Sequence, residues 1–156
     1  MICCTGIGAD GILTLGRTLE EHPEIDTVCE FGTAASISKG VVGRIYECTT
    51  FCDFDGNIIA SSPSFTQLPT AAVVGDDNVY TGHGCDWADL LEMPLLYTME
   101  TLRFRQITLE FRRHFCSLRL VSDNGKGNIR EKVITELEKA KPEVLKVLNQ
   151  FSRLKI

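Results

Sequence analysis

Short apolar runs alternate with segments of helical periodicity along this chain, and that alternation restricts the fold more than any other feature of the sequence. A strand, a helix and the next strand usually form a right-handed crossover unit. The pattern therefore predicts a three-layer α/β/α architecture with a mainly parallel, mixed sheet. The length fits one domain, so we expect a single domain over residues 1–156. Strands are predicted at residues 2–5, 27–31, 41–51, 79–81, 95–98 and 116–122.

The helices are predicted from apolar residues that recur every three or four positions. Segment 100–115 has this spacing, with four arginines between its apolar positions. The C-terminal segment 129–154 is expected as two helices interrupted near Pro142, because proline lacks the N–H that a helix interior needs. Segment 53–77 is rich in Gly, Pro, Ser and Asp, which indicates a loop with one or two weak strands.

The charge and composition of the chain limit the classes of molecule that it is expected to bind. The formal net charge of -5 disfavours contact with nucleic acid or anionic lipid. No apolar run reaches the roughly 18 residues that span a bilayer, and the first residues lack the pattern of a signal peptide. Seven cysteines with irregular spacing, mostly inside apolar runs, are typical of reduced thiols in a reducing compartment, so we expect a cytoplasmic protein. The arginines at positions 103, 105, 112 and 113 are interpreted as a solvated helix face.

No metal or other cofactor is predicted. Cys48, Cys52, His83 and Cys85 are the residue types that bind zinc, but the sequence contains no CxxC pair. The Gly6-x-Gly8 turn is too short for a dinucleotide-binding fingerprint, and P-loop, HExxH and GxSxG motifs are all missing from the sequence.

Two carboxylates follow apolar strands. Asp123 comes directly after strand 116–122, and Glu100 follows strand 95–98. Ligands of such sheets bind beyond the carboxyl ends of the strands, so both residues are candidate site residues. Each also has a structural interpretation, Asp123 as a turn or N-cap residue and Glu100 as a first-turn helix acid. Arg119 lies inside the strand before Asp123, where burying it requires a carboxylate partner.

Five sequence blocks carry a resemblance to a known family: Thr5-Gly6-Ile7-Gly8, Phe31-Gly32-Thr33-Ala34-Ala35, Val42-Gly43-Arg44-Ile45, Thr98-Met99-Glu100-Thr101 and Arg119-Leu120-Val121-Ser122-Asp123. Their order resembles that of the purine nucleoside phosphorylase family, and they are most similar to 5'-methylthioadenosine/S-adenosylhomocysteine nucleosidases. The resemblance implies the phosphorylase/nucleosidase fold in a shortened form. It also implies cleavage of the N-glycosidic bond of a purine nucleoside without a cofactor.

The resemblance also implies roles for individual residues. Asp123 would be the acid at the purine ring, oriented by Ser122 and Arg119. Glu100 would hold the ribose hydroxyls. A carboxyl that acts as an acid near neutral pH needs a partly desolvated pocket or a hydrogen-bonded network. The substrate-binding set implied by the resemblance is Thr33, Ala34, Ala35, Met99 and Glu100, together with Gly8 and Cys85.

The chain departs from the family on the nucleophile side. The resemblance implies an additional first strand, which carries either the water-activating glutamate or the phosphate-gripping residues, and we expect this chain to lack it. By resemblance, Glu30 lies near the position at which phosphorylases carry a phosphate-binding arginine. Its charge has the wrong sign for binding an anion, which favours hydrolysis over phosphorolysis with phosphate as cosubstrate. Glu47, Asp53 and Asp55 are alternative sources of the missing base. The alternative function is a catalytically impaired relative that binds a nucleoside or purine base, or a homo-oligomeric binding protein. By resemblance the oligomer is expected to be a dimer.

Overall fold

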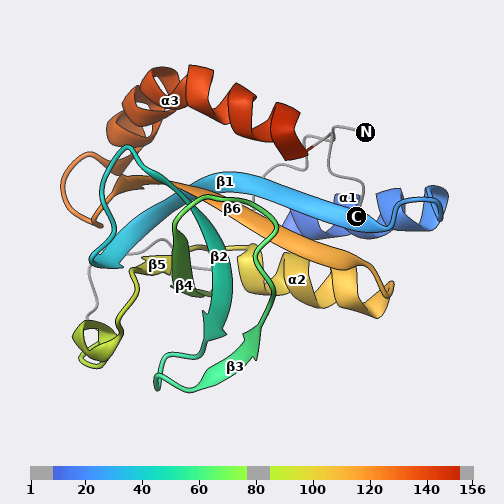
Figure 1. The fold of residues 1–156 in the computed structure, drawn as a ribbon, viewed down its shortest axis with the longest axis horizontal. Coiled ribbons are helices and arrows are strands. Elements are labelled where there is room, and N and C mark those ends of the chain that lie inside the picture. Colours follow the sequence, from blue (N-terminus) through green and yellow to red (C-terminus); the bar gives the residue numbers. More distant parts are fainter. Residues whose placement is uncertain (1–8, 77–84, 152–156) are drawn as a thin grey trace.

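The structure is a computed structural model in which residues 9–76 and 85–151 are described. Three helices and a six-stranded sheet form the described part of the chain, with one short 3-10 helix (Figure 1). The strands that the sequence predicts at residues 2–5 and 79–81 lie outside the described residues. The elements are α1 (Ala9–Glu21), β1 (Thr27–Ser38), β2 (Ile45–Cys52), β3 (Ile58–Ser61), β4 (Thr70–Val74), η1 (Ala88–Leu90), β5 (Leu95–Tyr97), α2 (Thr101–Glu110), β6 (His114–Asp123) and α3 (Ile129–Phe151).

The sheet is mixed, as predicted, and it also closes on itself. Its strand order is β3-β2-β4-β5-β1-β6, and β6 pairs with β2 as well as with β1. Strands β1–β6, β2–β4 and β4–β5 pair in parallel, whereas β1–β5, β2–β3 and β2–β6 pair antiparallel. Five strands therefore form a closed ring, and β3 lies outside it as an edge strand.

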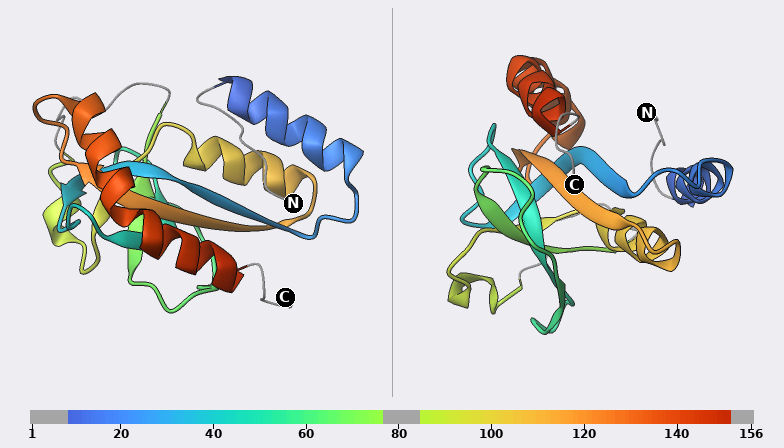
Figure 2. Two further views of the ribbon diagram at one scale, coloured as in Figure 1. Left: turned by 90° about the horizontal axis from the view of Figure 1, so that it is seen from above. Right: turned by 45° about the vertical axis from the view of Figure 1, so that its right-hand side comes forward.

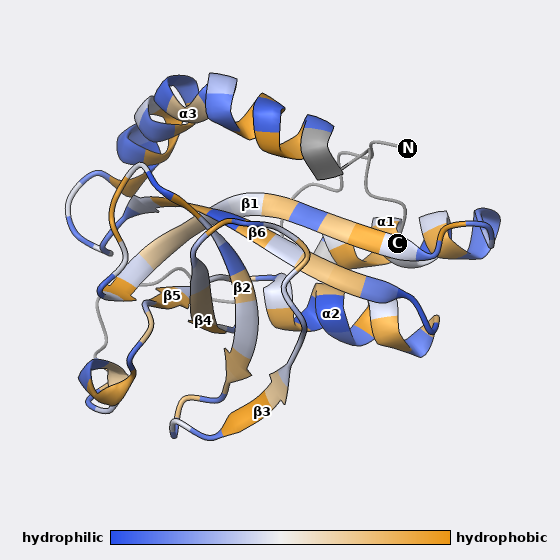
Figure 3. Ribbon diagram, viewed as in Figure 1, coloured by the Kyte–Doolittle hydropathy of each residue, from blue (hydrophilic) through white to orange (hydrophobic). Residues whose placement is uncertain are grey.

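Helices cover both sides of the long β1–β6 pair, which confirms the α/β class (Figure 2). Leu118 and Leu120 of β6 pack against Ala140 and Val147 of α3. On the other side, α1 and α2 lie next to one another, and their apolar residues join the main core of the sheet. Figure 3 shows hydrophobic colour on much of β4 and β5, whose residues 71–74 and 95–97 are buried.

The parallel register of β1 and β6 positions the carboxyl ends of both strands. Gly32 is the partner of Arg119 and Ala34 is the partner of Val121. The register then shifts, and Ala35 pairs with Asp123. Irregular pairing of this kind re-aims side chains at a sheet edge. As a result, the small residues that follow Gly32 lie beside the end of β6.

Two predicted strand boundaries differ from the structure by more than two residues. Strand β1 continues through the small residues 32–36 to Ser38, because it is paired with β6 on one side and with β5 at its end. Strand β2 begins only at Ile45, since Gly43 has a φ of 84° in the preceding turn. The weak strands predicted within 53–77 are confirmed as β3 and β4.

The helix predictions also need correction at their ends. Helix α2 ends at Glu110, and Arg112 has a φ of 58°, so the chain turns there. Phe115, predicted to be helical, instead lies in β6 and packs its ring near Phe51. Helix α3 continues through Pro142. Buried residues on both sides of this proline, Ala140 and Val147, pack on the same cluster and hold the two halves in line.

Within residues 9–76 and 85–151, none of the helices is long and apolar enough to cross a membrane. The described cysteines are all free thiols: Cys29, Cys48, Cys52, Cys85 and Cys116.

Candidate functional site

A cavity of about 570 Å³ lies where the end of β6, the second half of β1, the start of α2 and the start of α3 meet. Its wall contains side chains from all four elements. Apolar residues of α3, namely Ile129, Val133 and Leu137, line one side. Of the ten site residues that the sequence predicts, the cavity brings together eight: Thr33, Ala34, Ala35, Met99, Glu100, Arg119, Ser122 and Asp123.

The other two predicted residues are Gly8 and Cys85, and Cys85 is not among the lining residues. Gly8 lies outside the described residues. Cys85 packs in the neighbouring apolar cluster that contains Tyr97 and Met99. Burial, followed by the nearby charge of Asp86, raises the pKa of the Cys85 thiol.

Asp123 is buried at the end of β6, with an exposed fraction of 4%. Its Oδ1 accepts a 2.7 Å hydrogen bond from the Gly125 backbone N–H, and its Oδ2 accepts one of 2.8 Å from the Ser122 hydroxyl. Ser122 Oγ also lies 3.3 Å from the carbonyl oxygen of Ala34.

This hydroxyl can serve both protonation states of Asp123. When Asp123 is ionised, the Ser122 hydroxyl donates a hydrogen bond to its carboxylate. When Asp123 carries a proton on Oδ2, it can donate to Ser122 Oγ while Ser122 donates to the Ala34 carbonyl, because a hydroxyl is both donor and acceptor.

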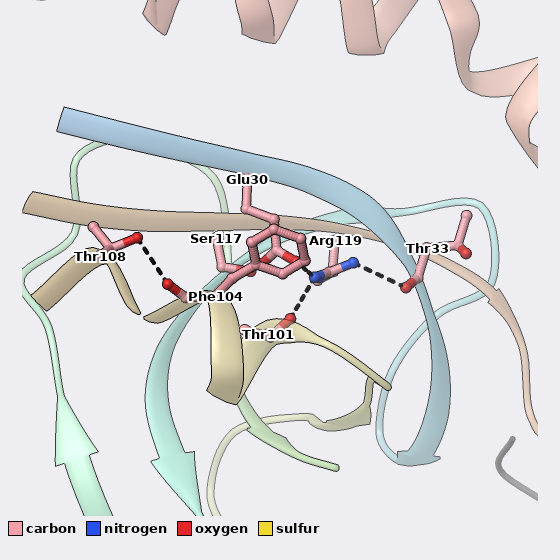
Figure 4. Close-up of polar contacts among 7 residues, drawn as sticks. All are labelled: Glu30, Thr33, Thr101, Phe104, Thr108, Ser117 and Arg119. Carbon is pink, nitrogen blue, oxygen red and sulfur yellow. Dashed lines mark hydrogen bonds and ion pairs between the residues drawn. The ribbon is translucent and has the colours of Figure 1, made fainter. Parts of the chain in front are cut away.

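The carboxylate partner that a buried Arg119 requires is Glu30. Its Nη2 forms an ion pair with Glu30 and a hydrogen bond to the Thr101 hydroxyl (Figure 4). Its Nη1 donates a 3.4 Å hydrogen bond to the Thr33 carbonyl oxygen. Ser117 donates a 3.0 Å hydrogen bond to the other oxygen of Glu30.

These contacts give Arg119 a different position from the one implied by the resemblance. Arg119 precedes Asp123 by four residues in β6. Its guanidinium lies between β1 and the first turn of α2, where it binds Thr33 and Thr101. Ser122 contacts Asp123 directly, whereas the Arg119 hydrogen bonds found in the described part of the chain go to other residues. The side chains of Arg119 and Glu30 are 3% and 9% exposed, so the ion pair is shielded from bulk water.

Glu100 begins α2 in the N-cap position, with no capping hydrogen bond from its side chain to the helix. Its backbone carbonyl accepts the first helical hydrogen bond, from Phe104 N–H at 2.9 Å. A carboxylate is stabilised at a helix N-terminus by the aligned peptide dipoles. This position places its carboxylate at the wall of the cavity together with Met99.

Glu30 lines the cavity and Thr101 binds Arg119, and the sequence did not predict that either residue contacts Arg119. A signal for Glu30 was present, because Arg119 requires a buried carboxylate and the neighbouring predicted strand, 27–31, contains only one acidic residue. The register that brings Glu30 beside Ser117 and Arg119 depends on the tertiary structure. Thr101 had no comparable signal, since it follows Glu100 in a helix start of ordinary composition.

The alternative bases that the sequence offers lie elsewhere. Glu47 is 1% exposed and accepts hydrogen bonds from loop 64–66: from Ser64 Oγ at 2.7 Å, Phe65 N at 2.7 Å, Thr66 N at 2.9 Å and Thr66 Oγ1 at 2.6 Å. Asp53 accepts bonds from Asn57 in an exposed turn, and those bonds lower the pKa of Asp53. Neither residue lines the cavity described above, and neither does Asp55.

In the described segments, no cluster of three or more His, Cys, Asp or Glu side chains is arranged to hold a metal ion.

The closed mixed sheet and its flanking helices form a fold similar to that of solved nucleosidase structures. This confirms the sequence resemblance at the level of the fold. No protein-family model matches the chain, and no curated protein matches it.

Three solved structures illustrate the similarity. The 5'-methylthioadenosine nucleosidase of Arabidopsis thaliana superimposes with a TM-score of 0.65 at 14% identity, covering 95% of this chain and 71% of the other. The S-adenosylhomocysteine nucleosidase of Streptococcus pyogenes, in complex with 5-methylthiotubericidin, gives 0.70 at 14% identity, covering 92% and 74%. The futalosine hydrolase of Helicobacter pylori, as a mutant, gives 0.60 at 12% identity, covering 87% and 70%.

Proposed function

We propose that this protein cleaves the N-glycosidic bond of a purine nucleoside with water. The observation that supports the proposal is the shared cavity in which Asp123, held by Ser122 and Gly125, lies on one wall with Glu100 and the backbone of residues 33–35. The nucleosidases of similar fold give this arrangement its chemical interpretation.

In the proposed reaction the C1'–N bond breaks as its electron pair moves to the purine. Asp123 donates a proton to a purine nitrogen, so that the base leaves without a negative charge. Positive charge develops on the ribose, and the carboxylate of Glu100 both binds the ribose hydroxyls and stabilises that charge. Water then forms the new C1'–O bond and releases its proton to solvent, and Asp123 takes up a proton from solvent, so that charge and atoms balance over the cycle.

The cavity dimensions suit this substrate class. A volume of about 570 Å³ lies within the range of roughly 300–1,000 Å³ that is usual for small-molecule sites. Apolar side chains of α3 on one wall and polar groups at the ends of β1 and β6 match a ligand with a flat base and a hydroxylated sugar. By resemblance we further propose that the chain acts as a single domain and as a homodimer in the cytoplasm.

Purified protein incubated separately with 5'-methylthioadenosine, adenosine and inosine tests the proposal. We expect free base to appear with at least one of them, at a rate that added inorganic phosphate does not increase. Chromatography of the products should show free sugar and no sugar phosphate. Binding of the nucleoside without any release of base would contradict the enzymatic proposal and support the alternative of a nucleoside-binding protein.

A further inference from the structure

We propose that Glu30 decides which nucleophile the cavity accepts: it neutralises Arg119 and so excludes phosphate. The inference rests on the proposed function, because it concerns the partner of the nucleoside in that reaction. It is carried by the ion pair between Glu30 and Arg119 at the cavity wall and by the charges of the other lining residues.

The charged residues that line the cavity are three acids and one base. Glu30, Glu100 and Asp123 face a space in which Arg119 is the one basic lining residue of the described chain. Because Glu30 already pairs with Arg119, the lining as a whole keeps an excess of acidic groups. Such a cavity favours a cationic ribose and disfavours an entering anion.

Most of the terminal N–H donors of Arg119 already form hydrogen bonds within the protein. Both terminal nitrogens bind protein oxygens, on Glu30, Thr101 and Thr33. Phosphate is recognised by arginine mainly through two parallel N–H bonds, and that fork is taken up by the protein itself. Two of the five N–H groups of Arg119 are left over, one on Nη1 and one on Nε, and Nε is buried with no partner among the described residues. Because each two-N–H fork of the guanidinium includes a bond from Nη2, these leftover groups suit the oxygen of a neutral molecule such as water better than a phosphate.

Removing the charge of Glu30 should make the guanidinium of Arg119 available to an anion. In Glu30→Gln the guanidinium would lose its counter-ion, and an anion could take its place. Titration calorimetry with inorganic phosphate, without nucleoside, is expected to show no binding to the natural protein at millimolar concentrations. We expect Glu30→Gln to bind phosphate at least tenfold more tightly, and the double variant Glu30→Gln, Arg119→Gln to lose that gain.

A matched control distinguishes the effect of freeing Arg119 from the effect of removing one negative charge from the cavity. Glu100→Gln removes one carboxylate from the same cavity and leaves the Glu30–Arg119 pair in place. Phosphate binding is expected to stay as weak in Glu100→Gln as in the natural protein. If Glu100→Gln and Glu30→Gln gain phosphate affinity equally, net charge alone decides and the role assigned to Glu30 is wrong.

Leaving Arg119 buried without a counter-ion is destabilising, so circular dichroism must first show that Glu30→Gln is folded. If it is not, the natural protein still tests the proposal. Phosphate that binds the natural protein more tightly than the double variant would overturn the proposal, and equally weak binding to both would support it. None of these measurements needs turnover, so a failure to release base would contradict the proposed function without affecting this result.

Discussion

Gly32 and Arg119 face each other across the parallel pairing of β1 and β6, and the guanidinium of Arg119 occupies the space that a Cβ on residue 32 would fill. The glycine is needed here for room. Its absent side chain lets Arg119 lie flat over β1, where Nη1 reaches the Thr33 carbonyl and Nη2 reaches Glu30. A residue without a side chain thus permits the ion pair at the cavity wall.

Gly32→Ala is therefore expected to destabilise the protein. The new methyl group overlaps Arg119 Nη1, and overpacking a buried site typically costs about 1–3 kcal/mol. Displacement of the guanidinium should also weaken its contacts with Glu30 and Thr101. Urea unfolding followed by circular dichroism measures the change in the free energy of unfolding.

The control for this substitution is Gly16→Ala. Gly16 lies inside α1, and apart from the backbone of α1 itself no atom of the described residues lies within 4 Å of the position that a methyl group would take there. Alanine is the better helix former, and we expect a gain of about 0.5–1 kcal/mol in the free energy of unfolding. Equal effects of the two substitutions would contradict the close packing of Arg119 on Gly32.

Glu47 is expected to act in stability and not in chemistry. Its carboxylate accepts four hydrogen bonds from Ser64, Phe65 and Thr66, and a Gln side chain would turn an amide N–H₂ toward some of those donors. Hydrogen bonds to a charged group contribute about 1.5–3 kcal/mol each, and we expect Glu47→Gln to lower the free energy of unfolding by roughly 2–3 kcal/mol. Base release per folded molecule, measured below the unfolding transition, should change by less than about twofold. Loss of base release in folded Glu47→Gln would instead identify Glu47 as the missing base.

The Cys48 thiol should make stability fall at alkaline pH. Burial raises the pKa of Cys48 from its ordinary value of 9.0 to about 12 in the folded protein. The folded state then holds this proton more tightly than the unfolded state, so the contribution is fully present below pH 9 and is lost as the pH rises toward 12. Between these values the free energy of unfolding should fall by up to about 1.4 kcal/mol per pH unit from this group.

The comparison that isolates this effect is Cys48→Ala. Urea unfolding of both proteins at pH 8, 9, 10 and 11 should give curves that converge as the pH rises, because the variant lacks the titrating thiol. A constant difference at all four pH values would contradict the assignment to Cys48.

The sequence predicts the fold class and most element positions because these depend on local periodicity and on residues at strand ends. Asp123, Ser122 and Glu100 were found in this way, and all three line the cavity. The continuation of β1 beyond Gly32 was not predicted, since small residues normally weaken a strand. Pairing with both β5 and β6 holds them there, and that pairing is a property of the whole sheet.

The sequence predicted which residues line the cavity better than it predicted the contacts between them. A buried Arg119 implies a carboxylate, but the choice of Glu30 depends on the register of β1 against β6. Glu47 resembled a candidate base in the sequence, because an acid in a strand can either face a site or anchor a loop. The loop at residues 64–66 that binds it is distant in sequence and has no signal of its own.

The central claim is that Asp123 donates the proton to the leaving purine, and the turnover rate of Asp123→Asn tests it most directly. Asparagine keeps the shape of the side chain and can still accept from the Gly125 N–H, so the fold should be retained. Asn124→Ala, at the exposed neighbouring position, is the control. We expect kcat for base release to fall by about 10²–10⁴-fold in Asp123→Asn, with Asn124→Ala near the natural rate. A folded Asp123→Asn variant that releases base within a few fold of the natural rate would contradict the account.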